Sequence, residues 1–463
     1  MFIGREAELS ILNEKYGSGK GELVVLYGRR RVGKTETLRQ FCRGRERVFY
    51  SCVETTGHQQ LQLFSAQLLE KDARAARYLR SFEDWQQAFS SLADDGAPSE
   101  RKLLVIDEFP YMVKSAPQVT SILQNIWDSD LKDRNVMIVL CGSSMSFMEK
   151  DVLSEKNPLY GRATAVVEMK PMGFFDAAKF LPHYSRAEQV LAYSILGGTP
   201  YYLAQFDDTK AVGENIKYNI LRKGCVLFSE VEFLIRQELR EPGVYNSIIE
   251  AVALGGTQLN EIHQKTLVEK NKLTAYIKNL MELGVMRREF PASTGAKERA
   301  NAQRGLYRLT DNYFRFWYAF IFPNKSELEA GDVNGIYEHA VEPYLDSYAS
   351  FIFEDVCIEY LRRRNAAESL PFHFTGIGRW WSGATEIDIL ASDHAKKRFL
   401  IAECKYRKTP FSAAQYEALK GKQTPADSFE RHYVLFSKSG FTPELRKIAA
   451  AEGTELVSLG DMV

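Results

Sequence analysis

Three largely apolar runs in the first 150 residues have the pattern of buried parallel strands. They read ELVVLY (22–27), LLVID (103–107) and VMIVLCG (136–142). Strands of a parallel sheet are buried on both faces and therefore appear as continuous apolar runs. The stretch TETLRQFC (35–42) instead has helical spacing and no helix breaker. The pattern predicts an α/β domain with a parallel sheet over residues 1–170.

The pattern of the remaining chain predicts three further domains. Residues 171–240 are assigned to a helical lid, with a hinge at the glycines of LGGTPYYL (196–203). Residues 241–325 contain helical stretches followed by two β-like runs, VMRREF and GLYRLT, and fit a winged helix-turn-helix. Residues 326–463 combine a helix (351–364) with candidate strands at 385–392, 398–407 and 432–439. We expect a second α/β domain there.

Composition limits the kinds of protein that this chain can be. Its 463 residues exceed one ordinary core, and 60 basic against 60 acidic residues give zero net charge. Contact with nucleic acid would therefore be local. The six cysteines are scattered without a CxxC pair, which favours buried thiols in a reducing cytoplasm over disulfides or a zinc cluster. No secretion signal is visible, and no apolar run approaches the roughly 20 residues of a membrane span.

The loop after the first predicted strand matches the phosphate-binding motif G-x-x-x-x-G-K-[ST]. Residues 28–35 read GRRRVGKT, between a strand and a helix as the motif requires. Backbone N–H groups of such a loop surround the phosphates, the lysine adds charge there, and the threonine hydroxyl binds Mg²⁺. The predicted ATP-binding residues of this segment are Gly28, Arg29, Arg30, Arg31, Val32, Gly33, Lys34, Thr35 and Glu36. The alternative is a chance glycine-rich turn.

The second apolar run ends in two acids, as a Walker B strand does. Asp107 is expected to hold Mg²⁺, and Glu108 to orient the attacking water. Ser143, after the third run, is a candidate sensor of the γ-phosphate, although hydroxyls at strand ends also form turns. Arg162 in NPLYGR is a candidate donor of charge to the transferring phosphoryl group, from its own subunit or a neighbour's. A surface salt bridge explains Arg162 equally well.

These motifs together resemble those of archaeal-type ATPases of the AAA+/STAND kind. FIGREAEL, GRRRVGKT, LLVIDEFPYM, LCGSS, PLYGR and LGGTPYYL follow one another in the same order. The resemblance implies that Arg5 and Glu6 lie near the adenine and that the protein cycles between nucleotide states.

Basic residues outnumber acidic ones in the predicted winged helix. The acidic residues of this segment are Glu282, Glu289 and Glu298, and they are outnumbered by basic residues. The basic residues are Lys270, Lys272, Lys278, Arg287, Arg288, Lys297, Arg299, Arg304 and Arg308. Such a stretch could contact DNA phosphates, or it could be a solvated face of a domain that binds other parts of the chain. The aromatic run 307–323 fits buried packing better than base stacking.

Two of the C-terminal candidate strands carry acidic residues. In TEIDIL, alternation puts Glu386 and Asp388 on one face and turns Ile387 and Ile389 to the core. In AECKY it puts Glu403 and Lys405 together. Asp388 and Glu403 would bind Mg²⁺, and Lys405 would orient a water molecule or bind the phosphate.

The same residues form the D…E-x-K arrangement of restriction-endonuclease-like nucleases, with Glu354 as the further acid found in many of them. The segment also resembles the "DEXX-box ATPase C-terminal" domain, including its GIGRWW stretch (376–381). Ile387 stands where the nuclease signature often has proline.

We derive three hypotheses from these features. The first is an ATP-hydrolysing protein that acts on DNA and whose nucleotide state controls a Mg²⁺-dependent nuclease-like domain. The second is a switch that binds DNA or protein without cleaving it. The third, a small-molecule kinase, leaves the C-terminal acids unexplained. ATP and Mg²⁺ are the expected cofactors, DNA is the expected partner, and a homo-oligomer remains open.

Overall fold

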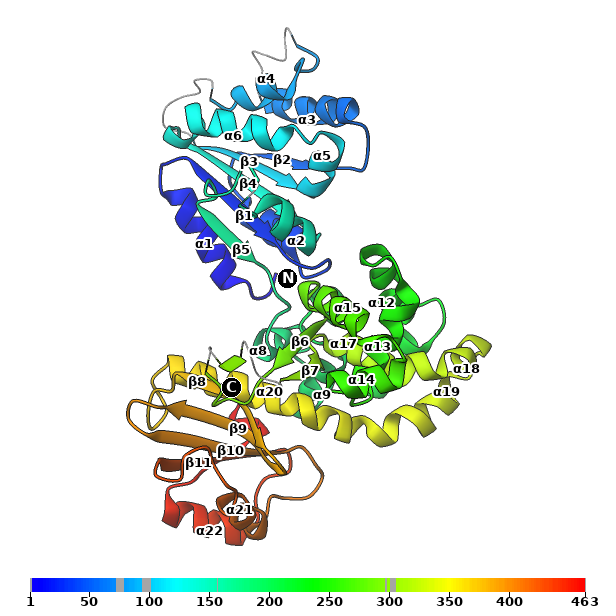
Figure 1. Cartoon of the computed structure of the whole chain (residues 1–463), viewed down its shortest axis with the longest axis vertical. Coiled ribbons are helices and arrows are strands. Elements are labelled where there is room, and N and C mark those ends of the chain that lie inside the picture. Colours follow the sequence, from blue (N-terminus) through cyan, green and yellow to red (C-terminus); the bar gives the residue numbers. More distant parts are fainter. Residues whose placement is uncertain are drawn as a thin grey trace. The chain divides into compact units, whose positions relative to one another are not determined.

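The computed structural model describes residues 2–71, 79–93, 101–155, 157–295, 298–299 and 305–462. The chain divides into two compact units, Met1–Pro171 and Met172–Val463 (Figure 1). The first contains a five-stranded parallel sheet and the second contains a separate five-stranded sheet, so the predicted α/β class is confirmed. In these described ranges, no helix has both the length and the apolar character needed to cross a membrane.

The N-terminal unit is built on a parallel sheet with strand order β2-β3-β4-β1-β5. Its central strands are buried from end to end, as their apolar runs require. The strands are β1 (Glu22–Tyr27), β2 (Val48–Ser51), β3 (Lys102–Asp107), β4 (Val136–Gly142) and β5 (Ala165–Glu168). The three predicted runs therefore lie at β1, β3 and β4.

Helices cover both faces of this sheet. Helices α1 and α2 share one core with it, and α3 to α6 share the other. The helices are α1 (Glu6–Gly17), α2 (Lys34–Phe41), α3 (Gly57–Lys71), α4 (Trp85–Ser90), α5 (Phe109–Ser115), α6 (Val119–Ser129) and α7 (Met145–Phe147). Since all strands are parallel, the loops after β1, β3 and β4 meet at one edge, where ligands of such sheets bind.

The C-terminal unit begins with helices that pack around an aromatic core. Tyr313, Phe314, Phe316, Trp317 and Tyr318 are all buried in that core, so the prediction of buried packing for the aromatic run is confirmed. The helices before the hairpin are α8 (Phe174–Ala177), α9 (Arg186–Leu196), α10 (Pro200–Leu203), α11 (Val212–Asn215), α12 (Val226–Glu238), α13 (Pro242–Ala253), α14 (Leu259–Thr266) and α15 (Lys270–Glu282). Those after it are α17 (Asn312–Phe316), α18 (Lys325–Ala330), α19 (Val333–Ile336) and α20 (Leu345–Ala366).

Gly198 lies against the first residue of the C-terminal unit. The Met172 N–H donates to the Gly198 carbonyl at 2.8 Å, and a Cβ on Gly198 would stand 1.7 Å from the Met172 carbonyl oxygen. Any side chain here would push the two segments apart. The predicted hinge thus contains a glycine that its packing requires, and its movement stays a prediction.

The antiparallel hairpin formed by β6 (Met286–Glu289) and β7 (Leu306–Leu309) follows α15. It lies on the C-terminal sheet. The Ala292 N–H donates to the Arg379 carbonyl at 2.8 Å, and Trp380 Nε1 donates to Ser293 Oγ at 3.0 Å. The hairpin and this sheet therefore belong to one packed assembly, although the sequence suggested a boundary near residue 325.

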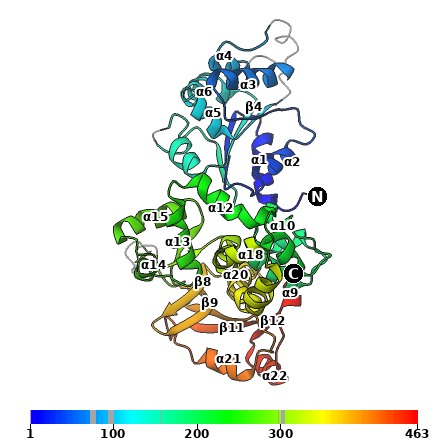
Figure 2. The same cartoon turned by 90° about the vertical axis from the view of Figure 1, so that its right-hand side faces the viewer.

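The C-terminal sheet has the order β12-β11-β10-β9-β8 and is mixed. Strands β8 to β10 are antiparallel neighbours, and β10 to β12 are parallel. Helix α20 packs on one face, and α21 and α22 pack on the other (Figure 2). The elements are β8 (Gly376–Ser382), β9 (Thr385–Asp393), β10 (Arg398–Lys405), α21 (Ala413–Lys420), β11 (Glu430–Ser437), α22 (Pro443–Glu452) and β12 (Glu455–Ser458).

A bulge interrupts β9. The register of β8 on β9 shifts between Gly378 and Trp380, so that Arg379 alone lies opposite both Asp388 and Ile389. An extra residue of this kind bends a strand and re-aims the side chains beside it. The Asp388 side chain therefore does not follow the regular alternation of side chains along β9.

The expectation that Ile387 and Ile389 face the same core was wrong. Ile387 packs with Leu390 on the side of α21 and α22, whereas Ile389 packs with Ala391 on the side of α20. The bulge is the physical reason, because one extra residue reverses the facing of every residue beyond it.

Candidate functional site

The P-loop connects β1 to α2 in a conformation that its glycines permit. A Cβ on Gly28 would stand 2.3 Å from the Met169 carbonyl oxygen, and Gly33 has φ 96° at the start of α2. Side chains are excluded at the first position by contact and disfavoured at the second by backbone strain. The loop therefore leads directly into the N-terminus of α2, whose N–H groups and dipole favour an anion.

Lys34 is buried at the base of this loop. Its Nζ donates to the Gly28 and Arg29 carbonyls, each at 2.8 Å. Burial lowers the pKa of Lys34, while the neighbouring Cys141, Glu108 and Asp107 act to raise it. The ammonium group is thus held beside the phosphate-binding loop by carbonyl groups of that loop.

Thr35 and Asp107 lie close enough to share one cation. Thr35 Oγ1 donates to Asp107 Oδ2 at 2.8 Å. Adjacent ligands of an octahedral Mg²⁺ ion, with Mg–O distances of about 2.1 Å, are about 3 Å apart. The two oxygens therefore fit the ion without rearrangement of the strand or helix that carries them. When bound, Mg²⁺ would neutralise charge on the nucleotide phosphates.

Glu108 and Ser143 form the second polar contact at this edge of the sheet. Ser143 Oγ donates to Glu108 Oε2 at 2.8 Å, and Glu108 has φ 54°, in the left-handed region. Such strain in a residue with a side chain is typical of functional sites. Ser143 thus holds the carboxylate that was predicted to orient water.

Replacing Ser143 with alanine is expected to reduce ATP turnover about tenfold, because the Glu108 carboxylate loses the hydroxyl group that orients it. Nucleotide affinity is expected to stay unchanged. Phosphate release and nucleotide titration measure the two quantities. Ser144→Ala is the matched control, since the Ser144 side chain makes no capping bond to α7. Equal turnover in both variants would show that Ser143 does not position Glu108.

The other P-loop residues have different surroundings. Arg30 lies 3.3 Å from the Tyr111 hydroxyl, Arg31 has φ 72°, and Glu36 pairs with Arg39 on the surface. Buried Val32 offers its carbonyl to an arginine outside the loop, as described next.

Arg5 joins the N-terminal segment to the P-loop. Its guanidinium donates to the Val32 carbonyl at 2.6 Å and to the Lys170 carbonyl at 2.8 Å, and it pairs with Glu8 at 2.9 Å. The family resemblance placed Arg5 near the adenine. The contacts add that Arg5 braces the loop against the segment after β5.

Arg162 is engaged in an exposed ion pair. Its Nη2 lies 2.8 Å from Asp128 Oδ2, and its Nη1 donates to the Tyr160 carbonyl at 3.1 Å. This geometry is the surface salt bridge that the sequence left open. A role in phosphoryl transfer would require Arg162 to leave Asp128.

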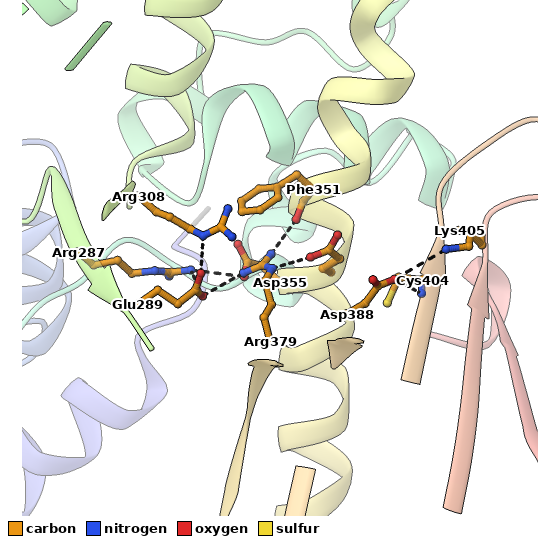
Figure 3. Close-up of polar contacts among 10 residues, drawn as sticks. Arg287, Glu289, Arg308, Phe351, Asp355, Arg379, Asp388, Cys404 and Lys405 are labelled. Atoms are coloured by element: carbon orange, nitrogen blue, oxygen red, sulfur yellow. Dashed lines mark hydrogen bonds and ion pairs between the residues drawn. The ribbon is translucent and has the colours of Figure 1, made fainter. Parts of the chain in front are cut away.

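A second polar cluster forms where β9 meets β10. Asp388 Oδ2 accepts the Cys404 N–H at 2.8 Å and lies 4.0 Å from Lys405 Nζ (Figure 3). Lys405 also pairs with Glu403 Oε1. The three residues of the predicted D…E-x-K set are therefore adjacent.

The electrostatics of this cluster differ between its two carboxylates. Burial and the charge of Glu403 raise the pKa of Asp388. Burial also acts to raise the pKa of Glu403, but Lys405 and Lys422 hold it below its usual value. Two partly buried carboxylates that repel each other are the environment that a divalent cation relieves.

Asp388 and Glu403 are compatible with Mg²⁺. No three acidic, histidine or cysteine side chains within the described ranges converge as a metal site. Mg²⁺ needs fewer, because it keeps several waters and uses one or two carboxylates together with substrate phosphates.

Glu354 belongs to a different network, centred on Arg379. The Arg379 side chain is 1% exposed and pairs with Glu354, with Asp355 at 2.9 Å and with Glu289 at 3.2 Å. It also donates to the Phe351 carbonyl at 2.9 Å. In Figure 3 the guanidinium lies between residues of the hairpin and residues of α20.

Arg379 changes the interpretation of Glu354. Burial raises the pKa of Glu354 to about 7, and Arg379 opposes that effect. The nearby Asp388 charge raises it as well. Glu354 thus lies close enough to the second cluster to interact with Asp388, but its carboxylate is bound to the guanidinium.

Two basic residues of the hairpin form ion pairs with nearby acids. Arg308 pairs with Glu289, and Arg287 lies 3.2 Å from Glu289 and 3.7 Å from Asp355. Lys297 and Arg304 lie outside the described residues. Ion pairs with Glu289 and Asp355 therefore offset part of the excess positive charge that was counted from the sequence.

Helix α15 carries three exposed lysines. Lys270 is exposed, Lys272 lies 3.4 Å from Glu269, and Lys278 lies 3.9 Å from Glu282 in exposed pairs. Exposed pairs of this kind are weak and open readily. Their lysines thus remain accessible to a phosphate backbone.

Arg379, Glu289 and Lys422 were not predicted as members of these clusters. Arg379 stands in an apolar-flanked strand, GIGRWWS, where a charged residue implies a buried partner. Lys422 carries no such signal, because it lies in a polar segment and approaches Glu403 only through the fold.

Comparison with known proteins identifies the family of each part of the chain. Residues 2–206 match the family model described as "ATPase domain predominantly from Archaea", and residues 317–419 match one described as "Archaea bacterial proteins of unknown function". The chain is 34% identical over 443 residues to the uncharacterized protein MJECL04 of Methanocaldococcus jannaschii, covering 95% of this chain and 96% of the relative.

Two further similarities concern parts of the chain. A segment of 41 residues, 9% of this chain, is 49% identical to the uncharacterized ATP-binding protein MJ0423 of the same organism and covers 70% of it. The Walker-type ATPase PABY2304 of Pyrococcus abyssi has a similar fold, with TM-score 0.51 and 20% identity. That match covers 68% of this chain and 96% of the structure.

Proposed function

This chain belongs to the archaeal-type ATPases that carry the matched C-terminal domain, and from that premise we propose that its ATPase controls a Mg²⁺-dependent nuclease acting on DNA. The chain is an ATPase by family. In this proposal Thr35 and Asp107 hold Mg²⁺, and helices α13 to α15 form a DNA-binding winged helix. The C-terminal unit cleaves the DNA.

One observation carries the nuclease proposal. Beside the bulge in β9, Asp388 Oδ2 lies 4.0 Å from Lys405 Nζ, and Lys405 pairs with Glu403 Oε1, so two carboxylates and one ammonium group lie together. Bound Mg²⁺ would supply positive charge at the phosphate oxygens. Asp388 and Glu403 would hold the ion, and the Lys405 ammonium would orient the attacking water.

DNA is the substrate class that the exposed lysines of α15 favour. Lys270, Lys272 and Lys278 of this helix are all exposed and could neutralise backbone phosphates. The zero net charge of the chain confines such contact to a local patch.

Purified protein with Mn²⁺ or Mg²⁺ is expected to cleave DNA. Asp388→Asn is expected to reduce the rate at least about 100-fold because it removes a ligand charge of the metal ion, and Lys405→Ala by a similar factor because it removes the ammonium group that orients the attacking water. Plasmid and single-stranded substrates should be tested with ATP, with ADP and without nucleotide. Glu386→Gln, an exposed acid on the same strand, is the matched control.

A non-cleaving switch is the second candidate. It is favoured by the ion pairs of Arg308 with Glu289 and of Glu354 with Arg379, which withhold the largely buried Arg308 and Glu354 side chains from a substrate. Absence of cleavage under every nucleotide condition, together with nucleotide-dependent DNA binding, would establish the switch and reject the nuclease.

A further inference from the structure

Both oxygens of the Glu403 carboxylate are bound by lysines. Lys405 Nζ pairs with Glu403 Oε1, and Lys422 Nζ lies 2.8 Å from Glu403 Oε2. Lys422 follows α21, so it reaches the cluster from a loop rather than from the strands that carry the other members. Its charge also acts on Asp388, where it lowers the pKa against the larger effect of burial.

The position of Lys422 is specific to that residue. Lys420, two residues earlier, points to other acids: its Nζ lies 2.7 Å from Glu417 and 2.9 Å from Glu452. The Lys422 side chain is 27% exposed, and Glu403 is 11% exposed. The partly exposed ammonium group of Lys422 therefore contacts the mostly buried carboxylate of Glu403 at the edge of the proposed cleavage site.

We propose that Lys422 is a second phosphate-binding lysine of the C-terminal site, an inference that rests on the nuclease function proposed above. The cluster of Asp388, Glu403, Lys405 and Lys422 carries two negative and two positive charges. A divalent cation that binds the two carboxylates replaces the ammonium groups as their partner. The lysines are then released next to the ion.

The chemistry of lysine suits this exchange. An ammonium group is a compact point charge on a flexible four-carbon stem, so it can turn from a carboxylate to a phosphate oxygen without movement of the backbone. With Lys405 assigned to the attacking water, Lys422 is left to bind a non-bridging oxygen of the phosphate. Charge placed there stabilises the transition state.

The same residue should therefore affect metal binding and cleavage in opposite directions. Without substrate, Lys422 competes with the cation for Glu403, and its loss should tighten metal binding. With substrate, it contributes charge at the phosphate, and its loss should slow cleavage. A residue that only maintained the shape of the site would weaken both.

The test uses full-length protein with the substitutions Lys422→Met, Lys422→Arg and Lys420→Met. Mn²⁺ affinity is measured by calorimetry without nucleotide or DNA, with Asp388→Asn as the reference for this site, and DNA cleavage is measured in single turnover. For Lys422→Met we expect Mn²⁺ to bind about tenfold tighter and cleavage to slow at least about tenfold. Lys422→Arg should retain most of the cleavage, and Lys420→Met should match the unsubstituted protein.

Each other outcome overturns the inference. Parallel loss of metal binding and cleavage would make Lys422 structural, parallel gain would make it only a competitor of the metal, and no change would exclude a role. If the unsubstituted protein shows neither Asp388-dependent Mn²⁺ binding nor cleavage, the nuclease function itself fails and this inference falls with it. Cleavage that Lys422→Met leaves intact rejects the inference alone.

Discussion

Lys34→Ala is expected to reduce ATP hydrolysis by about 10²–10³-fold, because the variant lacks the buried positive charge beside the phosphates. The side chain is held by the Gly28 and Arg29 carbonyls, so its ammonium group is already oriented before nucleotide binds. An oriented charge needs little rearrangement as the γ-phosphoryl group is transferred. Alanine removes both the charge and the bonds that hold it.

Steady-state phosphate release measures this effect, and circular dichroism checks that the variant is folded. Lys114→Ala is the matched control, since Lys114 is an exposed lysine of the same unit that pairs with Glu54 on the surface. Turnover equal to that of the control would mean that hydrolysis takes place elsewhere.

Arg379→Met is expected to destabilise the C-terminal unit by about 3–5 kcal/mol, the usual effect of removing one partner from a buried ion pair. The substitution leaves Glu289, Glu354 and Asp355 without the guanidinium that neutralises them. Arg308 and Arg287 compensate only in part, because Arg308 pairs with Glu289 and Arg287 lies near Asp355, whereas Glu354 pairs with Arg379 itself.

Thermal unfolding should show a lower transition temperature for this unit and little change in the ATPase unit. Arg362→Gln, which alters an exposed arginine on α20, provides the control. Adding Glu354→Gln to Arg379→Met should restore part of the lost stability, since one uncompensated carboxylate disappears. If Arg379→Met unfolds like the control, the network does not stabilise the unit.

The sequence predicted those parts of the structure that depend on local pattern. The apolar runs before Gly28 and Asp107 and at 136–142 could be assigned to parallel strands, because a strand buried on both faces needs such a run. The meeting of Asp388, Glu403 and Lys405 could be anticipated from two strands with acids at matching ends.

The prediction failed where position depends on three-dimensional packing. Strict alternation placed Ile387 and Ile389 together, and the bulge opposite Arg379 separates them. Glu354 was assigned to the acidic site without knowledge of the arginine that binds it. No local pattern brings Lys422 to Glu403, since the two residues meet only through the packing of the loop after α21.

The contacts of Arg379 also limit how this chain can be divided into recombinant fragments. A fragment of residues 326–463 would contain Arg379 but lack Glu289 and Ser293, and it would lose Phe174, whose N–H donates to Glu359 at 2.7 Å. A fragment beginning at Met172 keeps all of these partners. In evolution, too, exchange of the C-terminal sheet between proteins would have to carry the hairpin with it. The unit of inheritance is then larger than the sheet that bears the acidic residues.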